Sequence, residues 1–113
     1  RPVPIETIDG QRLQLRSVSA EHDASGLHAS GWVRRDPNNY GLVRAHLHAI
    51  ALDANGQELQ TVEIRWQGNL PTGVRSRRPA LFRADFDPAV AASTSSVRVS
   101  IQDGPLHTTA ARG

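Results

Sequence analysis

The strongest constraint on the fold is a run of alternating apolar and polar residues in the middle of the chain. From Val43 to Ala49 the two kinds of residue alternate with a period of two. Successive side chains of a strand point to opposite faces, so the run predicts a strand with one face in a core and one in water. Asn55-Gly56 supplies the residues of a tight hairpin turn, and the segment from Glu58 to Trp66 is the predicted returning strand.

Short extended segments, separated by glycine and proline, account for most of the remaining chain. The predicted strands cover residues 13–19, 27–35, 42–53, 57–66, 80–86 and 96–102, with at most one helical turn at 89–92. Several short strands divided by turn residues are typical of a sandwich or small barrel. We therefore expect an all-β fold, a single immunoglobulin-like antiparallel β-sandwich of six or seven strands.

The chain has 113 residues, enough for one domain with one two-layer core. We expect an extended N-terminal segment at residues 1–12, the β-sandwich domain at 13–105 and a flexible C-terminal tail at 106–113. The alternation also predicts which side chains fill the core: Leu15, Leu27, Val33, Val43, Leu47, Leu59, Phe82, Phe86, Val97, Val99 and Ile101.

The composition excludes several chemistries. Cysteine and methionine are both absent, so the chain has no disulfide, no thiolate nucleophile and no soft sulfur ligand for Cu(I). No serine elbow of the Gly-x-Ser-x-Gly kind and no glycine-rich phosphate loop occurs. We expect a protein that is not an enzyme.

The positive charge is modest although the sequence pI is about 10.4. All thirteen basic residues are arginine, and the formal net charge is only +2. Without lysine or cysteine, few groups lose charge between neutral pH and the guanidinium range, which explains the high pI. A nucleic-acid binder concentrates a basic excess on one face, so we expect no nucleic-acid partner.

The segment VRAHLHAIALDANGQEL, residues 43–59, resembles the central hairpin of small immunoglobulin-like domains exported by many bacteria, the FxLYD-like group. In that group an alternating strand ends in an aliphatic or aromatic residue, often Tyr, followed by Asp, a small residue, Asn or Asp, Gly, a polar pair and Leu. The residues that match this pattern are Leu52, Asp53, Asn55, Gly56 and Leu59. The resemblance implies a periplasmic or secreted β-sandwich used for binding or assembly, and it carries over no catalytic residue.

The start of the chain and its hydropathy bear on the compartment. The sequence begins abruptly at Arg1-Pro2-Val3-Pro4, as an exported protein does after removal of a signal peptide or downstream of a lipidated cysteine. No apolar run reaches the length of a transmembrane helix. We expect a periplasmic or secreted, non-enzymatic binding or assembly module of the bacterial cell envelope, lipid-anchored upstream of residue 1 if a lipobox precedes it. Its expected partner is an envelope protein or a cell-surface component.

Three histidines suggest an alternative function. If the turn at residues 36–41 joins the flanking strands into a hairpin, His28 lies opposite His48 and diagonal to His46. Three imidazoles at that spacing can bind Zn²⁺ or Cu²⁺, which would make the chain a periplasmic divalent-metal binding protein. The other interpretation is three solvated histidines and no cofactor. It holds if the two strands lie in different sheets.

Two features suggest a partner surface. Arg75, Arg77 and Arg78 stand close together in a predicted loop, and guanidinium groups bind carboxylate or phosphate in a bidentate manner. The alternative is a solubilising loop beside an edge strand. Trp32 is predicted on the outward face of its strand, where it either anchors a partner or is covered by residues 2–8.

Overall fold

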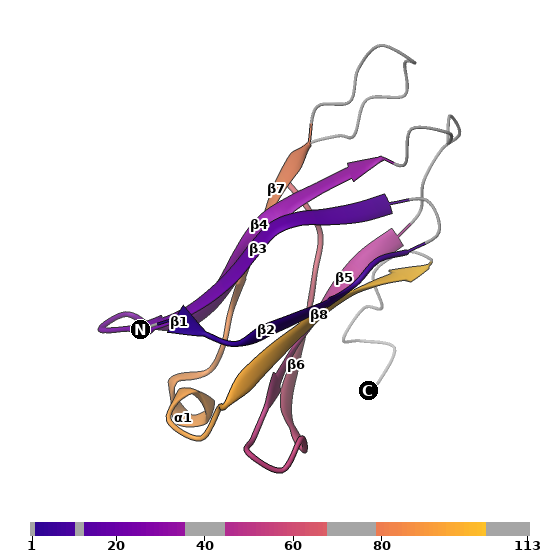
Figure 1. Cartoon of the computed structure of the whole chain (residues 1–113). Coiled ribbons are helices and arrows are strands. Elements are labelled where there is room, and N and C mark those ends of the chain that lie inside the picture. Colours follow the sequence, from indigo (N-terminus) through magenta and orange to yellow (C-terminus); the bar gives the residue numbers. More distant parts are fainter. Residues whose placement is uncertain (1, 11–12, 36–44, 68–78, 104–113) are drawn as a thin grey trace, which may run out of the picture.

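A computed structural model describes residues 2–10, 13–35, 45–67 and 79–103. These residues form two four-stranded sheets that face each other across one core (Figure 1). The strand order is β1-β3-β4-β7 in the first sheet, sheet A, and β2-β8-β5-β6 in the second, sheet B. The prediction of a single all-β sandwich is confirmed.

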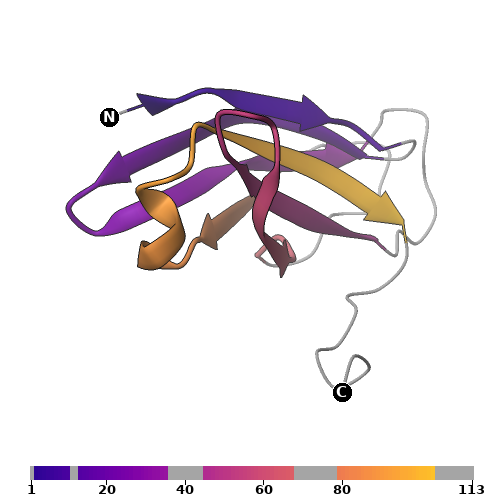
Figure 2. The same cartoon turned by 90° about the horizontal axis from the view of Figure 1, so that it is seen from below.

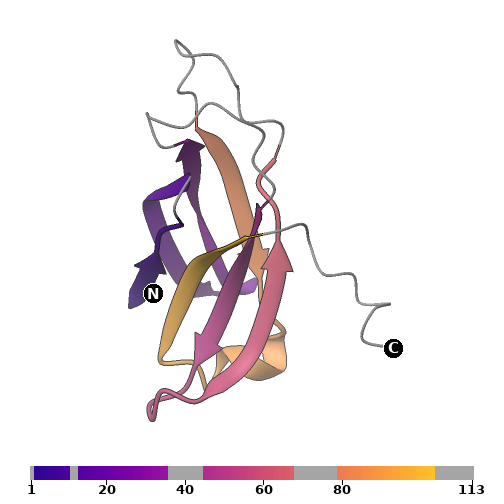
Figure 3. The same cartoon turned by 90° about the vertical axis from the view of Figure 1, so that its right-hand side faces the viewer.

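Each sheet is built from strands that are distant in sequence. Sheet A contains β1 (Pro2–Val3), β3 (Leu13–Asp23), β4 (Gly26–Arg35) and β7 (Ala80–Asp85). Sheet B contains β2 (Ile5–Ile8), β5 (Ala45–Leu52), β6 (Glu58–Ile64) and β8 (Ser96–Asp103), of which β8, β5 and β6 lie side by side in Figure 3.

A single helical turn, α1 (Pro88–Ala91), lies between β7 and β8. The carboxylate of Asp87 accepts a hydrogen bond from the backbone N–H of Ala89 at 2.9 Å, and a proline occupies the first turn, as is common at helix N-termini. In the described part of the chain, no helix has the length and apolar character needed to cross a membrane.

The N-terminal run contributes a strand to each sheet. β1 pairs antiparallel with β3, whereas β2 pairs parallel with β8, and Val97 N–H donates to the carbonyl of Pro4 at 3.0 Å where the run changes sheets. The run therefore follows one edge of the sandwich (Figure 2). Because the run forms two strands, the described residues contain eight strands, more than the predicted six or seven. The pairing of β2 with β8 is parallel, whereas the prediction was antiparallel throughout.

Strands β4 and β5 lie in different sheets, so the predicted hairpin between them is wrong. The observed hairpins are β3–β4 within sheet A and β5–β6 within sheet B. Both β4 and β5 bury an apolar face, and as opposite layers they bury these faces against the same core. If the N-terminal run is counted as strand A of an immunoglobulin domain, β3 is strand B and β4 is strand C, and these two share sheet A. In immunoglobulin domains strand B lies in the ABED sheet and strand C in the opposite CFG sheet, so the strand order of this sandwich differs from theirs.

The core follows the predicted alternation. Of the predicted core positions, eight are buried: Leu15, Leu27, Val33, Leu47, Phe82, Phe86, Val97 and Val99. Ile101 packs partly buried against them, and Val43 lies outside the described residues. Leu59 is 37% exposed, so its prediction is wrong. Val62 and Ile64 point inward from β6, and Leu59 has the opposite parity.

A β-bulge in β3 changes which residues of that strand face the core. Arg16 pairs with Trp32 and Ser19 with Ser30, so two residues of β3 stand opposite Gly31. Ser17 adopts the left-handed conformation with φ of 52°, and the Val18 side chain packs against the core. A β-carbon at Gly31 would lie 2.9 Å from the Val18 α-carbon and 3.0 Å from a ring carbon of Phe82. Position 31 therefore requires glycine.

We expect Gly31→Ala to destabilise the fold by about 1–3 kcal/mol, because the methyl group meets backbone on one side and a packed ring on the other. Urea denaturation measures the change. Ser30→Ala, at the neighbouring outward position, is the matched control and should change stability by no more than about 0.5 kcal/mol. Equal effects of the two substitutions would contradict the close packing at Gly31.

Candidate metal centre

Two histidines stand on the outer face of sheet B. β5 lies between β8 and β6, and its residues Ala45, Leu47, Ala49 and Ala51 belong to the core. His46 and His48 have the opposite parity and therefore point away from the core, as the alternation predicts. His46 is nevertheless fully buried, with 0% exposure, and the His48 side chain is 21% exposed.

The two imidazole rings converge on each other. Nε2 of His46 lies 3.0 Å from Nε2 of His48, and the ring centroids are 4.8 Å apart with the planes inclined at 55°. Two N–H groups cannot point at each other at this distance, so at most one proton occupies the space between the two nitrogens. At least one of the two Nε2 atoms therefore points a lone pair at the other ring, in the direction from which a metal ion could be bound.

Glu63 completes the cluster from the neighbouring strand. It lies opposite His48 in the β5–β6 register, and its Oε1 is 3.6 Å from His48 Nε2. The three ligand atoms of His46, His48 and Glu63 all lie within 4.8 Å of one another. With a side chain only 13% exposed, Glu63 brings a carboxylate into a largely buried position.

This donor set fits a divalent transition metal. Zinc binds imidazole nitrogen and carboxylate oxygen at about 2.0–2.2 Å, which puts two ligands of a tetrahedral site roughly 3.3 Å apart. The observed separations of 3.0 Å and 3.6 Å lie on either side of that value. The third separation, between His46 and Glu63, is no more than 4.8 Å. Side-chain adjustments of up to about 1.5 Å would therefore bring the three groups, which we call the His-His-Glu cluster, around one ion.

The predicted three-histidine site is wrong, because His28 lies on β4 in sheet A while His46 and His48 lie on β5 in sheet B. Sequence analysis missed Glu63, although a signal for it was present. In the structure, the Gly56 N–H donates to the Asp53 carbonyl across Ala54-Asn55, and the register shifts by one residue between the pairs Leu52–Glu58 and Ala51–Gln60. Asn55-Gly56 thus signalled the hairpin, and the register shift beyond it decides that Glu63 stands opposite His48.

His28 instead lies near two carboxylates of β3, Glu21 and Asp23, and its Nε2 is 3.4 Å from an Asp23 oxygen. Both carboxylates are exposed. Asp23 Oδ1 also accepts hydrogen bonds from the hydroxyl of Ser25 at 2.6 Å and from its N–H at 2.8 Å. The carboxylate therefore stabilises the β3–β4 turn, and this exposed group is a weaker metal candidate than the His-His-Glu cluster.

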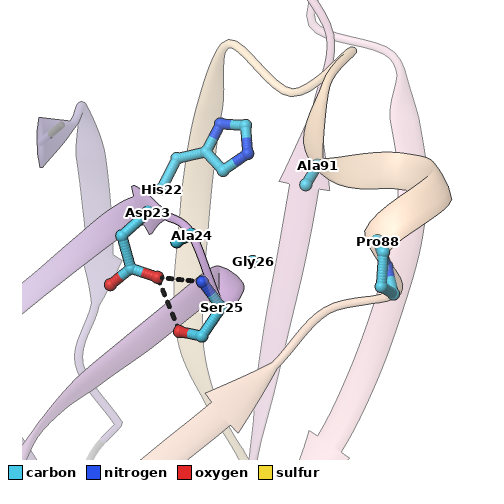
Figure 4. Close-up of a pocket in the computed structure, with 7 residues that line it drawn as sticks. All are labelled: His22, Asp23, Ala24, Ser25, Gly26, Pro88 and Ala91. Carbon is cyan, nitrogen blue, oxygen red and sulfur yellow. Dashed lines mark hydrogen bonds between the residues drawn. The ribbon is translucent and has the colours of Figure 1, made fainter.

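An open pocket of about 250 Å³ lies between the β3–β4 turn and α1 (Figure 4). The turn lines it with His22, Asp23 and Ser25, whereas the helix contributes Pro88 and Ala91. Figure 4 shows Asp23 and Ser25 hydrogen-bonded to each other. The pocket thus has one polar wall and one apolar wall. The carboxylate in the polar wall, that of Asp23, is hydrogen-bonded within the β3–β4 turn.

The remaining predicted site residues fall in two groups. Arg75, Arg77 and Arg78 lie outside the described residues. Trp32 is 41% exposed on the outer face of sheet A, so it points outward as predicted.

No protein-family model, curated protein or solved structure matches this chain, and its function is therefore inferred from the geometry of its own residues.

The Asp23 turn gives a prediction for pH dependence. The hydrogen bonds from the Ser25 hydroxyl and then from its N–H lower the pKa of Asp23 below 3.8. A carboxyl with a lowered pKa in the folded state stabilises the fold above its unfolded pKa, and this contribution is lost as the pH falls through the folded pKa. We expect Ser25→Ala to raise the pKa of Asp23 toward 3.8, measured from its carboxyl ¹³C signal by NMR.

The stability difference between Ser25→Ala and the parent protein should stay constant near neutral pH and shrink below about pH 3.8. Ser19→Ala, on the same face of β3, is the control and should leave the Asp23 titration unchanged. An unaltered Asp23 titration in Ser25→Ala would show that the hydroxyl does not hold the carboxylate.

Proposed function

We propose that this chain is a binding protein for a divalent transition metal, Zn²⁺ or Cu²⁺, held by the His-His-Glu cluster. The observation that carries the proposal is the convergence of His46 Nε2 and His48 Nε2 to 3.0 Å, with Glu63 Oε1 at 3.6 Å from the second nitrogen. A metal ion would replace the proton between the two rings, and the carboxylate would offset part of its charge.

The ligand chemistry selects the class of metal. Imidazole suits zinc and copper, whereas Ca²⁺ and Mg²⁺ prefer sites made of oxygen ligands. The absence of cysteine and methionine leaves no sulfur ligand for Cu(I). The cluster is therefore proposed to take Zn²⁺ or Cu²⁺ in the divalent state.

Three protein ligands also suit a role in assembly. A tetrahedral ion held by the cluster has a fourth position, which water or a side chain from another protein can occupy. The proposal thus places the metal within a non-enzymatic, exported binding or assembly module of the bacterial envelope, the function that the resemblance of the central hairpin implies. The β-sandwich fold is compatible with such a module.

Removing any one ligand should weaken metal binding. We expect one equivalent of Zn²⁺ or Cu²⁺ to bind the parent protein, and His46→Gln, His48→Gln or Glu63→Gln to lower the affinity at least about tenfold. Loss of an outer-shell partner alone typically costs about 10–100-fold, and loss of a direct ligand should cost no less. Isothermal titration calorimetry measures both stoichiometry and affinity.

His28→Gln is the matched control, because it removes an imidazole from the opposite sheet. It should leave the affinity unchanged. Circular dichroism of each variant checks that the fold is retained. The proposal fails if all four variants bind alike, or if the parent protein binds neither metal.

Metal binding should also stabilise the fold in a pH-dependent way. A ligand at a hundred times its Kd adds about 2.7 kcal/mol to the free energy of unfolding. Because protons compete for the imidazole nitrogens, we expect Zn²⁺ to raise the melting temperature at about pH 7.5 and to lose this effect toward about pH 5. Differential scanning calorimetry tests this. A similar stabilisation of His48→Gln by Zn²⁺ would contradict binding at the cluster.

A further inference from the structure

The outer face of sheet A carries a second surface that the metal centre does not use. Its centre is Trp32 on β4, which is 41% exposed. In the strand register Trp32 pairs with Leu81 of β7 on one side, itself 37% exposed, and with Arg16 of β3 on the other. Trp and Arg are enriched among the few residues that dominate binding energy at protein interfaces, and Leu81 extends the apolar area beside the indole.

Two guanidinium groups are held together beside Trp32. The side-chain oxygen of Gln14 accepts hydrogen bonds from Arg16 Nη2 at 2.7 Å and from Arg34 Nε at 3.2 Å. Arg16 also donates from Nη1 to the carbonyl of Leu15 at 2.9 Å. Neutral acceptors therefore fix the position of both groups without cancelling their charge.

These two arginines differ from others on the same molecule. Arg83 donates to Asp85 at 3.0 Å, and Arg98 donates to Glu6 at 2.8 Å. Among the described residues, Arg16 and Arg34 form no ion pair with a carboxylate. Their charges are consequently available to a carboxylate supplied by another molecule.

The β-bulge directly after Arg16 sets the shape of this surface. Ser17 has a positive φ, and the register between β3 and β4 shifts between Arg16 and Ser19. Bulges bend a strand and change the direction of its side chains, and a strained backbone is retained only where the surrounding packing supports it. Here the support is the close packing of Val18 on Gly31.

The charge on this face is divided between its two ends. Arg16 and Arg34 lie at one end, together with Trp32, while Glu21, Asp23 and Asp85 lie at the other. Arg83 stands between the two ends, and its charge is paired with that of Asp85. A long polyanion laid along the strands would meet these carboxylates and be repelled. The face therefore complements a short cluster of carboxylates next to an apolar side chain.

We propose that the Trp32 surface, formed by Gln14, Arg16, Trp32, Arg34 and Leu81, docks an acidic segment of a partner protein. An apolar side chain of that segment packs on Trp32 and Leu81, and neighbouring carboxylates accept paired hydrogen bonds from Arg16 and Arg34. The guanidinium fork suits this recognition better than an ammonium group, and the chain contains arginine but no lysine.

The test is an NMR titration of the ¹⁵N-labelled full chain with a capped peptide of Asp and Glu residues that contains two leucines. We expect the indole N–H signal of Trp32, assigned with Trp32→Phe, to shift in a saturable way. The double variant Arg16→Gln/Arg34→Gln should bind the peptide at least about tenfold more weakly, and Trp32→Ala should lose most of the binding.

Arg98→Gln is the matched control, since it removes an arginine charge from the other sheet, and it should bind the peptide like the parent protein. Retained signal dispersion in each variant shows an intact fold, and Arg34→Gln alone serves if the double variant unfolds. A peptide with Gln and Asn in place of the acids, and a single-stranded DNA of similar length, should both bind more weakly.

The proposal is overturned if the Trp32 signal does not respond to the acidic peptide. It is also overturned if the neutral peptide or the DNA binds as well as the acidic peptide, or if Arg98→Gln weakens binding as much as the double variant does. Because the Trp32 surface and the His-His-Glu cluster lie on different sheets, Zn²⁺ titration of the same variants reports separately on the metal site.

Discussion

The register of β5 determines both the core and the candidate metal centre. β8 and β6 pair with β5 from its two sides, so its position along the sheet is fixed twice. Side chains alternate along a strand, and the burial of Leu47 and Ala49 therefore commits His46 and His48 to the outer face. A shift by one residue would exchange the two sets and place imidazoles in the apolar core. The free energy that holds the core thus also holds the two ligands in place.

Sheet A departs from regular strand geometry, and this departure shapes its outer surface. The bulge at Ser17 costs conformational energy, which the packing of Val18 between the sheets offsets. Only a residue without a side chain can stand opposite, which is why Gly31 interrupts the inward row of Leu27, Ala29 and Val33 on β4. The outer faces of the two sheets also differ: sheet B buries its central polar residues His46 and Ser100, whereas sheet A exposes an indole and two fixed guanidinium groups.

Local patterns predicted the parts of this molecule that depend on neighbours in sequence. Alternation placed His46 and His48 on one face and Trp32 outward, and both placements are confirmed. Partners across the sheet depend on which strands pair. A turn signal between two strands does not distinguish side-by-side pairing from packing in opposite layers, and this is why His28 was wrongly assigned to the cluster. The Asn55-Gly56 turn indicates that β5 and β6 form a hairpin, but it does not fix the partner of His48, because the register shifts by one residue between Leu52–Glu58 and Ala51–Gln60.

The parallel pairing of β2 with β8 has a mechanical consequence. The chain enters β2 beside Val97 and leaves β8 beyond Ser100, at the opposite end of the paired segment. Tension applied to the chain before β2 and after β8 would therefore pull the two strands along their length in opposite directions. Their hydrogen bonds would be loaded in shear and share the force, whereas a hairpin pulled from its open end breaks its bonds one at a time. The parallel pairing thus gives the sandwich a force-bearing clamp between β2 and β8.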